Sequence, residues 1–376
     1  MMKRMLMCPN QQNILFFIDH LGRGGAERIT IDLAYNLAQR GHLVTIAALN
    51  GQRNLLTTPS SVRLIDLELS HSFAFGKMWK KKYLSVAEQK RLADVLTQVK
   101  PHLIITGYNN GHWLAPYLQG NVWHWIHGNL IENRKSSNLW LKIKNLIRKI
   151  RHQYAFKQLF NQKKIIIVNQ DLKDFYASLV PNSVIKVINN GVDPQNLIYK
   201  KNHRHNIKKW DAIFLGRLVP IKQVDHALTA FARSGLQGRL LIAGDGTEKE
   251  TLQKLAHELN IENRVDFGGW IENPKDVILQ SKILILSSRE EGFGLVVAEA
   301  LTLGTPVVAY NCSSGVRQQL CWAGGDSGLV PPQDIELLSK KISEVFHHPY
   351  HIDDNQLHHL TLDQTADQFE KLLDSP

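Results

Sequence analysis

The sequence predicts an α/β protein made of two domains of similar design. Three observations support this prediction. The chain has 376 residues, more than one ordinary hydrophobic core needs. Short apolar strands alternate with amphipathic helices, and the same alternation starts again near residue 184. This alternation is typical of parallel sheets with helices on both faces.

In the first half, the first predicted strand is 14–18, and Gly22-Arg23-Gly24-Gly25 leads from it into a predicted helix over 26–40. The helix has apolar residues at helical spacing and ends at Gly41, a usual stop signal. Further strands are expected in four segments: 43–48, 102–106, 121–126 and 164–168.

The second half begins with a strand at 184–188 and the turn sequence Asn-Asn-Gly-Val-Asp-Pro at 189–194, which places a domain boundary near 190. A helix is expected at 295–303. Strands are expected at 212–215, 239–243, 264–267, 283–286 and 306–309. The predicted domains are 1–189 and 190–360, and residues 361–376 form a terminal helix that could pack back toward the first domain.

Composition indicates a soluble globular protein, with 43% hydrophobic and 21% charged residues. The three cysteines, Cys8, Cys312 and Cys321, form no paired framework, which favours a reducing cytoplasm. No uncharged apolar run reaches the roughly 18 residues of a membrane span, so none is expected.

Positive charge is concentrated in the first half. Residues 1–195 carry 26 Lys and Arg against 11 Asp and Glu, whereas residues 196–376 carry 19 against 23. This asymmetry indicates an anionic partner for the first half, such as a membrane surface, a phosphorylated lipid or glycan, or nucleic acid. No recognised nucleic-acid motif accompanies the charge, so nucleic acid is not an expected partner.

Residues 134–164 are the most basic part of that half, with ten Lys and Arg and no acid. Apolar residues recur there at helical spacing, namely Leu139, Ile143, Leu146, Ile147, Ile150 and Tyr154. A basic amphipathic helix suits a membrane surface, but the stripe could equally be the core-facing side of a domain helix. We predict that the stripe is core and that the basic face is free to meet anionic lipid. Residues 77–83 add a second basic and aromatic patch.

Candidate binding residues follow the predicted strands, because open parallel sheets bind ligands beyond the carboxyl ends of their strands. Arg217 and Lys222 follow strand 212–215 and precede a helix. Two cations and a helix N-terminus suit a diphosphate, although the pair could also be ordinary surface charges. Glycine turns occur at 244–246 and before Trp270, and the second could let backbone groups approach a base, but such turns are more often only structural.

The stretch from Glu290 to Ala309 holds two further candidates. Glu291 precedes a Gly-Phe-Gly turn, and Glu299 lies about one turn into the next helix. The amides of Gly294, Leu295 and Val296 favour an anion. Carboxylates accept hydrogen bonds from hydroxyls, so the set suits a nucleotide sugar. The alternative is that Glu290 and Glu291 favour the helix start and Glu299 forms a salt bridge.

The first half offers fewer candidates. Gly24 and Gly25 lie in a turn that lacks the full G-x-G-x-x-G spacing, and the chain has no P-loop. His127 follows strand 121–126, where a lone histidine is more often structural than catalytic. No Cys or His spacing fits zinc and no D-x-D occurs, so no metal is expected.

These motifs in this order resemble the retaining glycosyltransferases of family 4 (glycosyl transferases group 1), which use nucleotide sugars on the GT-B fold. The matching segments are GGAE at 24–27, HG at 127–128, NGVD at 190–193, GRLVPIK at 216–222, AGDG at 243–246 and E-x7-E from 291 to 299. The resemblance implies two Rossmann-like domains facing across a cleft, the first binding the acceptor and the second the nucleotide sugar.

The resemblance also implies roles for these residues. Arg217 and Lys222 would hold the donor diphosphate and stabilise the leaving group, Glu291 would bind hydroxyls of the donor sugar, and His127 would lie near the reaction centre. Glu299 would bind the ribose. The remaining donor contacts would come from Gly24, Gly25, Trp270, Gly294, Leu295 and Val296.

The implied reaction is a retaining, metal-independent and cofactor-free transfer of a hexose or N-acetylhexosamine, from UDP, to a lipid-anchored glycan such as lipopolysaccharide core or a lipid-linked oligosaccharide. The implied location is cytoplasmic, at the inner face of the cytoplasmic membrane. Val219, Ile221 and Gln223 depart from the usual family pattern but leave both cations in place. The alternatives are a nucleotide-sugar epimerase or hydrolase, which lacks a convincing acid/base set here, and a non-catalytic anion-binding protein, which the four charged residues argue against.

Overall fold

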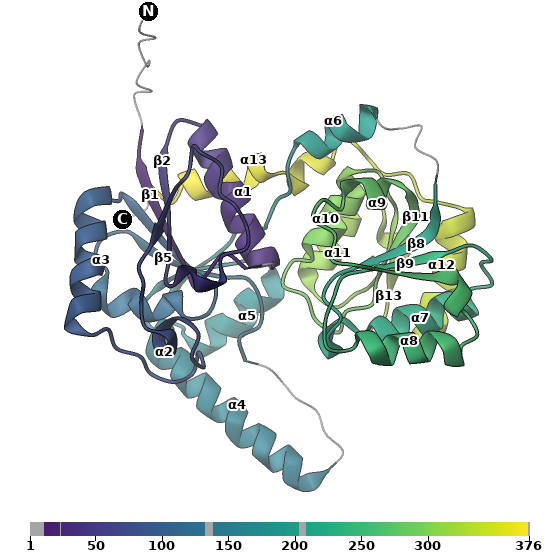
Figure 1. Cartoon of the computed structure of the whole chain (residues 1–376), viewed down its shortest axis with the longest axis horizontal. Helices are drawn as coiled ribbons and strands as arrows, with labels where there is room; N and C mark the ends of the chain where they lie inside the picture. The colour runs from purple at the N-terminus through teal and green to yellow at the C-terminus, as the bar shows by residue number, and fades with distance from the viewer. Residues whose placement is uncertain (1–10, 23, 132–137, 203–207, 375–376) are drawn as a thin grey trace, which may run out of the picture. The chain divides into compact units, whose positions relative to one another are not determined.

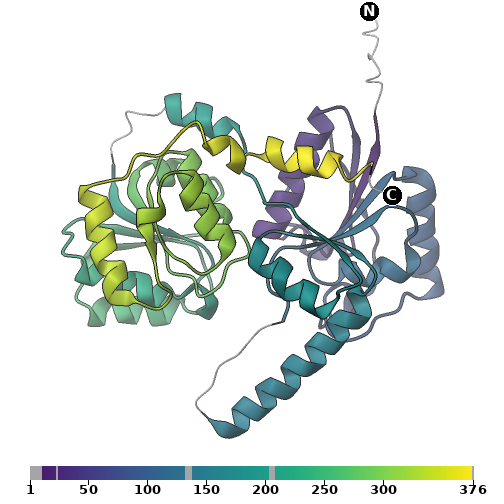
Figure 2. The same ribbon diagram turned by 180° about the vertical axis from the view of Figure 1, so that it is seen from behind.

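The structure, a computed structural model, describes residues 11–22, 24–131, 138–202 and 208–374 (Figures 1 and 2). The chain divides into two compact units, unit 1 with residues 1–189 and 365–376, and unit 2 with residues 190–364. Each unit is a parallel sheet with helices, in agreement with the predicted α/β class. Four residues considered above lie outside the described residues, namely Cys8, Arg23, Arg134 and Lys135.

Unit 1 contains a seven-stranded parallel sheet in the order β3-β2-β1-β4-β5-β6-β7. The strands are β1 (Asn13–Ile18), β2 (Leu43–Ala48), β3 (Arg63–Asp66), β4 (Leu103–Gly107), β5 (Val122–Ile126), β6 (Lys164–Ile167) and β7 (Val184–Val187). The chain builds outward from β1 to β3 on one side and then crosses to β4 on the other. The order therefore reverses between β1 and β4, which makes this pair a topological switch point.

The helices of unit 1 follow its strands. They are α1 (Gly25–Gln39), α2 (His71–Ala74), α3 (Val86–Val99), α4 (Leu139–Phe160), α5 (Gln170–Leu179) and α13 (Leu362–Glu370), with short 3-10 turns at Gly51–Arg53 and Gly111–Tyr117. The central strand β1 is a continuous apolar run, and Ile14 to Ile18 are buried. Burial on both faces is what a strand covered by helices on each side requires.

Unit 2 contains a six-stranded parallel sheet in the order β10-β9-β8-β11-β12-β13. The strands are β8 (Trp210–Leu215), β9 (Leu240–Ala243), β10 (Val265–Gly269), β11 (Ser281–Leu286), β12 (Val307–Tyr310) and β13 (Leu329–Val330). Here the order reverses between β8 and β11, so these two strands form the switch point. The loops that follow them carry the strongest candidate residues of the sequence.

The helices of unit 2 are α6 (Gln195–Asn202), α7 (Val224–Arg233), α8 (Lys249–Glu258), α9 (Lys275–Leu279), α10 (Leu295–Thr302), α11 (Ser314–Trp322) and α12 (Ile335–His347), with 3-10 turns at Pro220–Lys222, Glu262–Arg264, Asp326–Gly328 and Leu357–Leu360. One face of the sheet buries Phe214 and Ile242 in a core shared with Phe231 of α7 and Ile342 of α12.

The C-terminal helix α13 completes the core of unit 1. Phe369 packs its ring against Trp125 of β5, with 4.9 Å between ring centroids, and also lies near Phe16 of β1. Arg40 at the end of α1 donates to Asp367 at 2.6 Å and to Glu370 at 3.1 Å. The chain therefore leaves unit 1 after residue 189 and returns to it at residue 365.

Helix α4 differs from its prediction. The apolar stripe was predicted to be core, but Ile143, Ile147 and Ile150 are each more than half exposed, and the buried residues of the helix are Phe156, Leu159 and Phe160. Periodicity places a stripe on one face of a helix but does not say what covers that face. The second basic patch is also only partly at the surface, because Lys82 is buried and donates to the carbonyls of Ser72, Phe73 and Gly76.

Candidate active site

The loops after β8 and β11 are joined at the switch point of unit 2. β8 and β11 are neighbouring strands of the sheet. The amide of Arg289 donates to the carbonyl of Ile221 at 2.9 Å, and the hydroxyl of Ser287 donates to the carbonyl of Lys222 at 3.1 Å. Residues 287–289, just beyond β11, thus hold the 3-10 turn that presents Lys222.

Lys222 and Glu291 form a short ion pair in this place. Nζ of Lys222 lies 2.6 Å from Oε1 of Glu291, and the hydroxyl of Ser288 donates to the same oxygen at 2.7 Å. The side chains are 20% and 10% exposed, so the pair is mostly shielded from water yet reachable. The other carboxylate oxygen of Glu291, Oε2, accepts no hydrogen bond from the described residues. The carboxylate is therefore oriented by two donors with one oxygen left for a ligand.

Arg217 supplies a second cation on the same loop as Lys222. It lies two residues beyond the end of β8 and its side chain is exposed. Within the part of the chain that the structure describes, it forms no ion pair. A guanidinium without an internal partner can bind an incoming anion without first breaking a salt bridge.

The glycines after β9 hold the Arg217 loop in position. A Cβ added to Gly244, which has φ +144°, would lie 1.8 Å from the carbonyl oxygen of Gly216, and one added to Gly246 would lie 2.2 Å from that of Leu218. Backbone hydrogen bonds follow from this close approach, including Leu218 amide to Asp245 carbonyl at 2.9 Å. From the sequence these glycines could be assigned only to a turn, because a close contact between two loops leaves no local signal.

The start of α10 provides backbone amides for an anion. Gly294 is the N-cap with φ +82°, no side chain caps the helix, and the first turn holds no acid. Because glycine at the N-cap has no side chain to accept from them, the amides of Leu295 and Val296 are candidates to bind an anion. The buried side chain of Gln319 donates to the carbonyl of Phe293 and fixes the preceding turn.

The other predicted donor residues of unit 2 lie on the same edge of its sheet. Glu299 lies on α10 and is partly exposed, and Trp270 follows β10 and is 44% exposed. Cys312, after β12, is close enough to the ion pair for the charge of Glu291 to add to the effect of burial, and both raise the pKa of its thiol.

Unit 1 holds the remaining predicted residues. Gly24 caps α1 in an extended conformation, and a Cβ there would lie 2.3 Å from the carboxylate of Glu27, which is buried in the first turn. Gly25 is the first residue of the helix. Gly24 thus leaves space for the buried acid, a structural reason for glycine that does not exclude contact with a phosphate.

His127 follows β5, two strands from β1 in the sheet of unit 1. Both ring nitrogens are buried and make no hydrogen bond with the described residues, and the ring lies 4.2 Å from that of Trp125. Burial lowers the pKa of His127 to about 3. The imidazole is therefore neutral near pH 7 and can donate one hydrogen bond and accept another.

Asp19, which was not predicted from the sequence as a site residue, closes the switch point of unit 1. Its carboxyl follows β1 and accepts from the amide of Asn110 at 2.8 Å, from the Asn110 side chain at 2.9 Å and from the amide of Gly111 at 2.8 Å. It is 2% exposed, and burial raises its pKa to about 7. Its position directly after a buried strand was the available signal.

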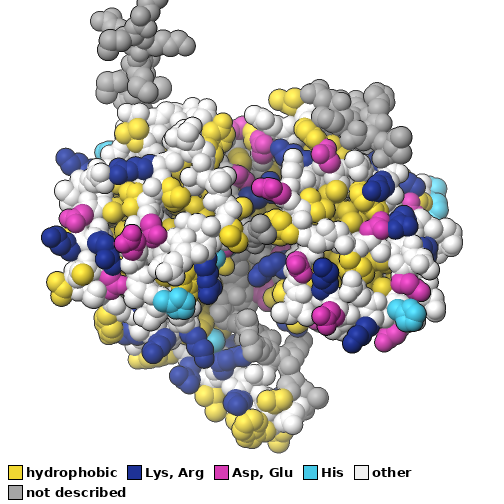
Figure 3. All heavy atoms as spheres, in the orientation of Figure 1, with side chains coloured by type: hydrophobic (Ala, Val, Ile, Leu, Met, Phe, Trp, Pro, Cys, Tyr) yellow, Lys and Arg dark blue, Asp and Glu magenta, His cyan; other side chains and the backbone are white. Residues whose placement is uncertain are grey.

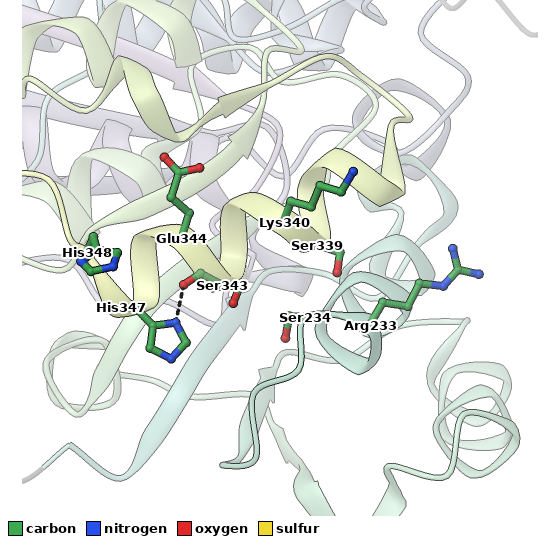
Figure 4. Close-up of a pocket in the computed structure, with 8 residues that line it drawn as sticks. All are labelled: Arg233, Ser234, Ser339, Lys340, Ser343, Glu344, His347 and His348. Carbon is green, nitrogen blue, oxygen red and sulfur yellow. Dashed lines mark hydrogen bonds between the residues drawn. The ribbon is translucent and has the colours of Figure 1, made fainter.

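A separate surface cavity lies on unit 2, where the end of α7 faces α12 (Figure 4). It is lined by Arg233, Ser234, Ser339, Lys340, Ser343, Glu344, His347 and His348. Helix α7 ends just before β9 begins, so the cavity is at the amino-terminal edge of the strands, away from the switch point. No group of three His, Cys, Asp or Glu that could hold a metal occurs among the described residues.

Comparison with known proteins identifies the family. The family model described as "Glycosyltransferase Family 4" matches residues 23–196, and the model described as "Glycosyl transferases group 1" matches residues 196–360. The chain is a group 1 glycosyltransferase. The loops that carry Arg217, Lys222 and Glu291 all lie within the second matched segment.

Individual relatives agree with this assignment. An uncharacterized glycosyltransferase of Haemophilus influenzae is 27% identical over 82% of this chain and 83% of its own length. The 4-alpha-N-acetylgalactosaminyltransferase of Campylobacter jejuni that acts on N-acetylgalactosamine-N,N'-diacetylbacillosaminyl-diphospho-undecaprenol is 23% identical over the same shares. The Anabaena protein HepE, solved in complex with UDP, matches with a TM-score of 0.68 at 18% identity, over 97% of this chain and all of that one. The glycosyltransferase thus has the GT-B fold.

Proposed function

We propose that this glycosyltransferase moves a hexose or N-acetylhexosamine from a UDP-sugar to a lipid-anchored glycan, with retention at the anomeric carbon and without a metal. The observation that carries the proposal is the Lys222–Glu291 ion pair at the switch point of unit 2, on whose first loop Arg217 forms no ion pair with the described residues. A donor needs cations for its diphosphate and a carboxylate for its hydroxyls, and this loop pair offers both.

The cations would stabilise the leaving group. As the bond from the sugar to the diphosphate breaks, negative charge grows on the phosphate oxygens. Lys222 and Arg217 lie on one loop and the α10 amides on another, so all three can meet that charge without a metal. Glycine contacts at 244 and 246 hold the Arg217 loop before substrate arrives.

The carboxylates would bind hydroxyl groups. Oε1 of Glu291 is held by Lys222 and Ser288, so Oε2 is the oxygen proposed to accept from the donor sugar. Glu299 is proposed to accept from the ribose, with Trp270 near the base. His127 is proposed to contact the transferred sugar as a neutral imidazole, since its pKa of about 3 excludes the charged form near pH 7.

The proposed step is a front-face displacement. The bond between the anomeric carbon and the diphosphate oxygen breaks, and the acceptor oxygen forms the new bond on the same face of the sugar. The proton of the acceptor hydroxyl passes to an oxygen of the departing phosphate. This route assigns no protein side chain as general base, consistent with Glu291 being occupied by Lys222.

The relatives support the substrate classes. The Anabaena neighbour was solved with UDP, and the Campylobacter relative acts on a diphospho-undecaprenol-linked sugar. The excess of positive charge in residues 1–195 fits an acceptor that carries a diphosphate or lies at an anionic surface.

The test is a thermal-shift screen of UDP-, GDP- and ADP-sugars, followed by transfer assays on lipid-linked acceptors. A donor present at about 100 times its Kd should stabilise the protein by roughly 2.7 kcal/mol. The product should carry one added sugar by mass and the donor's anomeric configuration by NMR, and EDTA should leave the rate unchanged.

Three results would contradict the proposal. Inversion at the anomeric carbon would remove the front-face route, and loss of activity in EDTA would remove metal independence. Conversion of the nucleotide sugar to its epimer or to free sugar, with no transfer to any acceptor, would favour the epimerase or hydrolase alternative.

A further inference from the structure

Helix α4 is attached to unit 1 by one end only. It has 22 residues, and its buried side chains, Phe156, Leu159 and Phe160, all lie in its last two turns. Figures 1 and 2 both show the helix running away from the sheet of unit 1, with its N-terminal end farthest from the sheet. That end is capped by Asn138, whose side chain accepts from the amides of Trp140 and Leu141, so the helix is properly terminated.

The part of α4 beyond this attachment exposes many apolar side chains. Their exposed fractions range from 42% to 73%, and they are Leu139, Trp140, Leu141, Ile143, Leu146, Ile147, Ile150 and Tyr154. They account for about half of the large apolar side chains exposed among the described residues of the whole chain. A contiguous apolar surface of this kind marks an interaction site.

The exposed stripe and the attached face lie on different sides of the helix. At about 100° per residue, Leu139, Ile143, Leu146, Ile150 and Tyr154 share one face. Phe156, Leu159 and Phe160 centre roughly 130° away around the axis. Unit 1 therefore holds α4 with its apolar stripe turned outward.

Cations border the stripe on both sides. Lys142 and Lys149, seven residues apart, lie along one border, and Lys144 and Arg151, also seven apart, lie along the other. Residues 138–164 contain no Asp or Glu. Figure 3 shows hydrophobic side chains gathered at the far end of α4, with Lys and Arg side chains beside them.

We propose that α4 lies in the surface of an anionic lipid bilayer, with the apolar stripe among the upper acyl chains and the flanking cations at the lipid phosphates. This arrangement is the one that an amphipathic helix adopts at a membrane interface. It deepens the proposed function and rests on it, because an acceptor on a lipid anchor must be reached at a membrane.

Charge complementarity selects this occupant over the others. An identical helix would bring six cations against six with no acid on either side, so a second copy of the chain is disfavoured. An uncharged apolar partner would cover the stripe but leave the four flanking cations without counter-charges. An anionic bilayer covers the apolar stripe with acyl chains and also supplies lipid phosphates as counter-charges for the four flanking cations.

The experiment is co-sedimentation of the full chain with phosphatidylcholine vesicles and with vesicles that also contain phosphatidylglycerol. The stripe variant is Ile143→Ser/Ile147→Ser/Ile150→Ser, and the charge variant is Lys142→Gln/Lys144→Gln/Lys149→Gln. Matched controls change exposed or partly exposed side chains elsewhere, Leu55→Ser/Val86→Ser/Ile198→Ser and Lys90→Gln/Lys249→Gln/Lys254→Gln.

Wild type should partition onto anionic vesicles and only weakly onto neutral ones, and more strongly at low ionic strength. The charge variant should lose roughly fivefold in partition coefficient for each cation removed. The stripe variant should lose at least about tenfold, and both controls should bind like wild type. Equal binding to both vesicle types, or wild-type binding by either α4 variant, would overturn the proposal.

Trp140 reports the depth of the helix directly. Brominated lipids should quench the fluorescence of wild type more than that of Trp140→Phe, because Trp140 borders the stripe. No difference between the two would place α4 outside the bilayer. Self-association of wild type without vesicles that the stripe variant lacks, measured by light scattering, would assign the face to a second copy instead.

These measurements need neither donor nor acceptor, so their failure is separate from failure of the proposed transfer. UDP-sugar binding by the α4 variants should equal that of wild type. Vesicle binding without any transfer activity would leave the α4 proposal standing and count against the proposed function alone.

Discussion

The two units share a topology but close their switch points with opposite chemistry. In unit 1, the loops after β1 and β4 are joined by Asp19, whose carboxyl is buried and takes up hydrogen bonds from Asn110 and Gly111. In unit 2, the loops after β8 and β11 are joined by the Lys222–Glu291 pair, which remains partly exposed. At the switch point of unit 1 the protein's own side chains therefore fill the place where a ligand could bind. At the switch point of unit 2 the charged pair stays partly exposed.

The topology of a sheet therefore predicts where a ligand could bind, but the side chains at that place decide whether one does. A carboxyl that is fully buried and internally hydrogen-bonded stabilises its loops. A carboxylate held through one oxygen by a lysine can exchange that partner for a charged ligand, and an arginine that forms no ion pair with the described residues lies on the same loop as the lysine. Substitutions at the two places should therefore have different consequences.

The largest expected effect is at unit 2. Lys222→Met or Glu291→Gln should lower kcat for transfer by roughly 10²–10³-fold, because each removes a charge that the proposed site uses to bind the donor or its leaving group. Circular dichroism and the unfolding midpoint should stay close to wild type. The matched control is Lys275→Gln, which removes the lysine of another ion pair of unit 2, Lys275–Asp193 at 3.1 Å, and should keep at least half of wild-type activity. Full activity in both site variants would show that the Lys222–Glu291 pair takes no part in transfer.

At the switch point of unit 1, a substitution should instead reduce stability and leave donor binding unchanged. Asp19→Ala leaves the buried amides of Asn110 and Gly111 without an acceptor and should lower the free energy of unfolding by about 2–4 kcal/mol. Urea titration followed by tryptophan fluorescence measures this. Isothermal titration with UDP should give an unchanged Kd, and a loss of UDP affinity with normal stability would contradict the assignment.

A smaller effect is expected where one unit 2 loop supports another. Gly244→Ala would push a Cβ into the carbonyl of Gly216 and displace the loop that bears Arg217. Donor Kd should rise by about tenfold, a loss of roughly 1.4 kcal/mol. Gly235→Ala is the control, because Gly235 also has a positive φ but no atom lies within 4 Å of its added Cβ. Equal donor binding by both variants would show that the loop contact does not position Arg217.

The unit 1 carboxyl should also make the stability of the protein depend on pH. The folded-state pKa of Asp19 is about 7 and its ordinary value is 3.8, so the folded chain holds a proton that the unfolded chain releases between these values. Stability from this group therefore falls as pH rises from 4 to 7, by at most about 1.4 kcal/mol per pH unit. The destabilisation caused by Asp19→Asn should be larger at pH 5 than at pH 8, and a pH-independent difference would contradict the burial argument.

Most of the fold was predictable because the strands are continuous apolar runs that the sequence displays directly. The core strands β1, β2 and β11 and the helices α1 and α10 lie within two residues of their predicted bounds. The strands that were missed, β3 and β13, have four and two residues and little apolar signal. Short edge strands are defined by their neighbours more than by their own sequence.

The candidate site was predictable only in part. Spacing after strands pointed to Lys222 and Glu291, and the structure brings these two into contact. It could not reveal that Gly244 supports Gly216 or that Gln319 fixes the carbonyl of Phe293, since both contacts join residues distant in sequence. The α4 stripe was assigned to the core because a helical pattern does not record whether anything packs on it.

The return of α13 to unit 1 has a consequence for synthesis on the ribosome. The chain is made from its N-terminus, so every strand of unit 1 leaves the exit tunnel before any strand of unit 2. Phe369, however, packs on Phe16 and Trp125. In the nascent chain, the part of the unit 1 core that Phe369 covers therefore stays exposed until all of unit 2 has been translated. Unit 2, although made later, can reach its final fold first, and unit 1 is the part of the nascent chain that chaperones would have to protect longest.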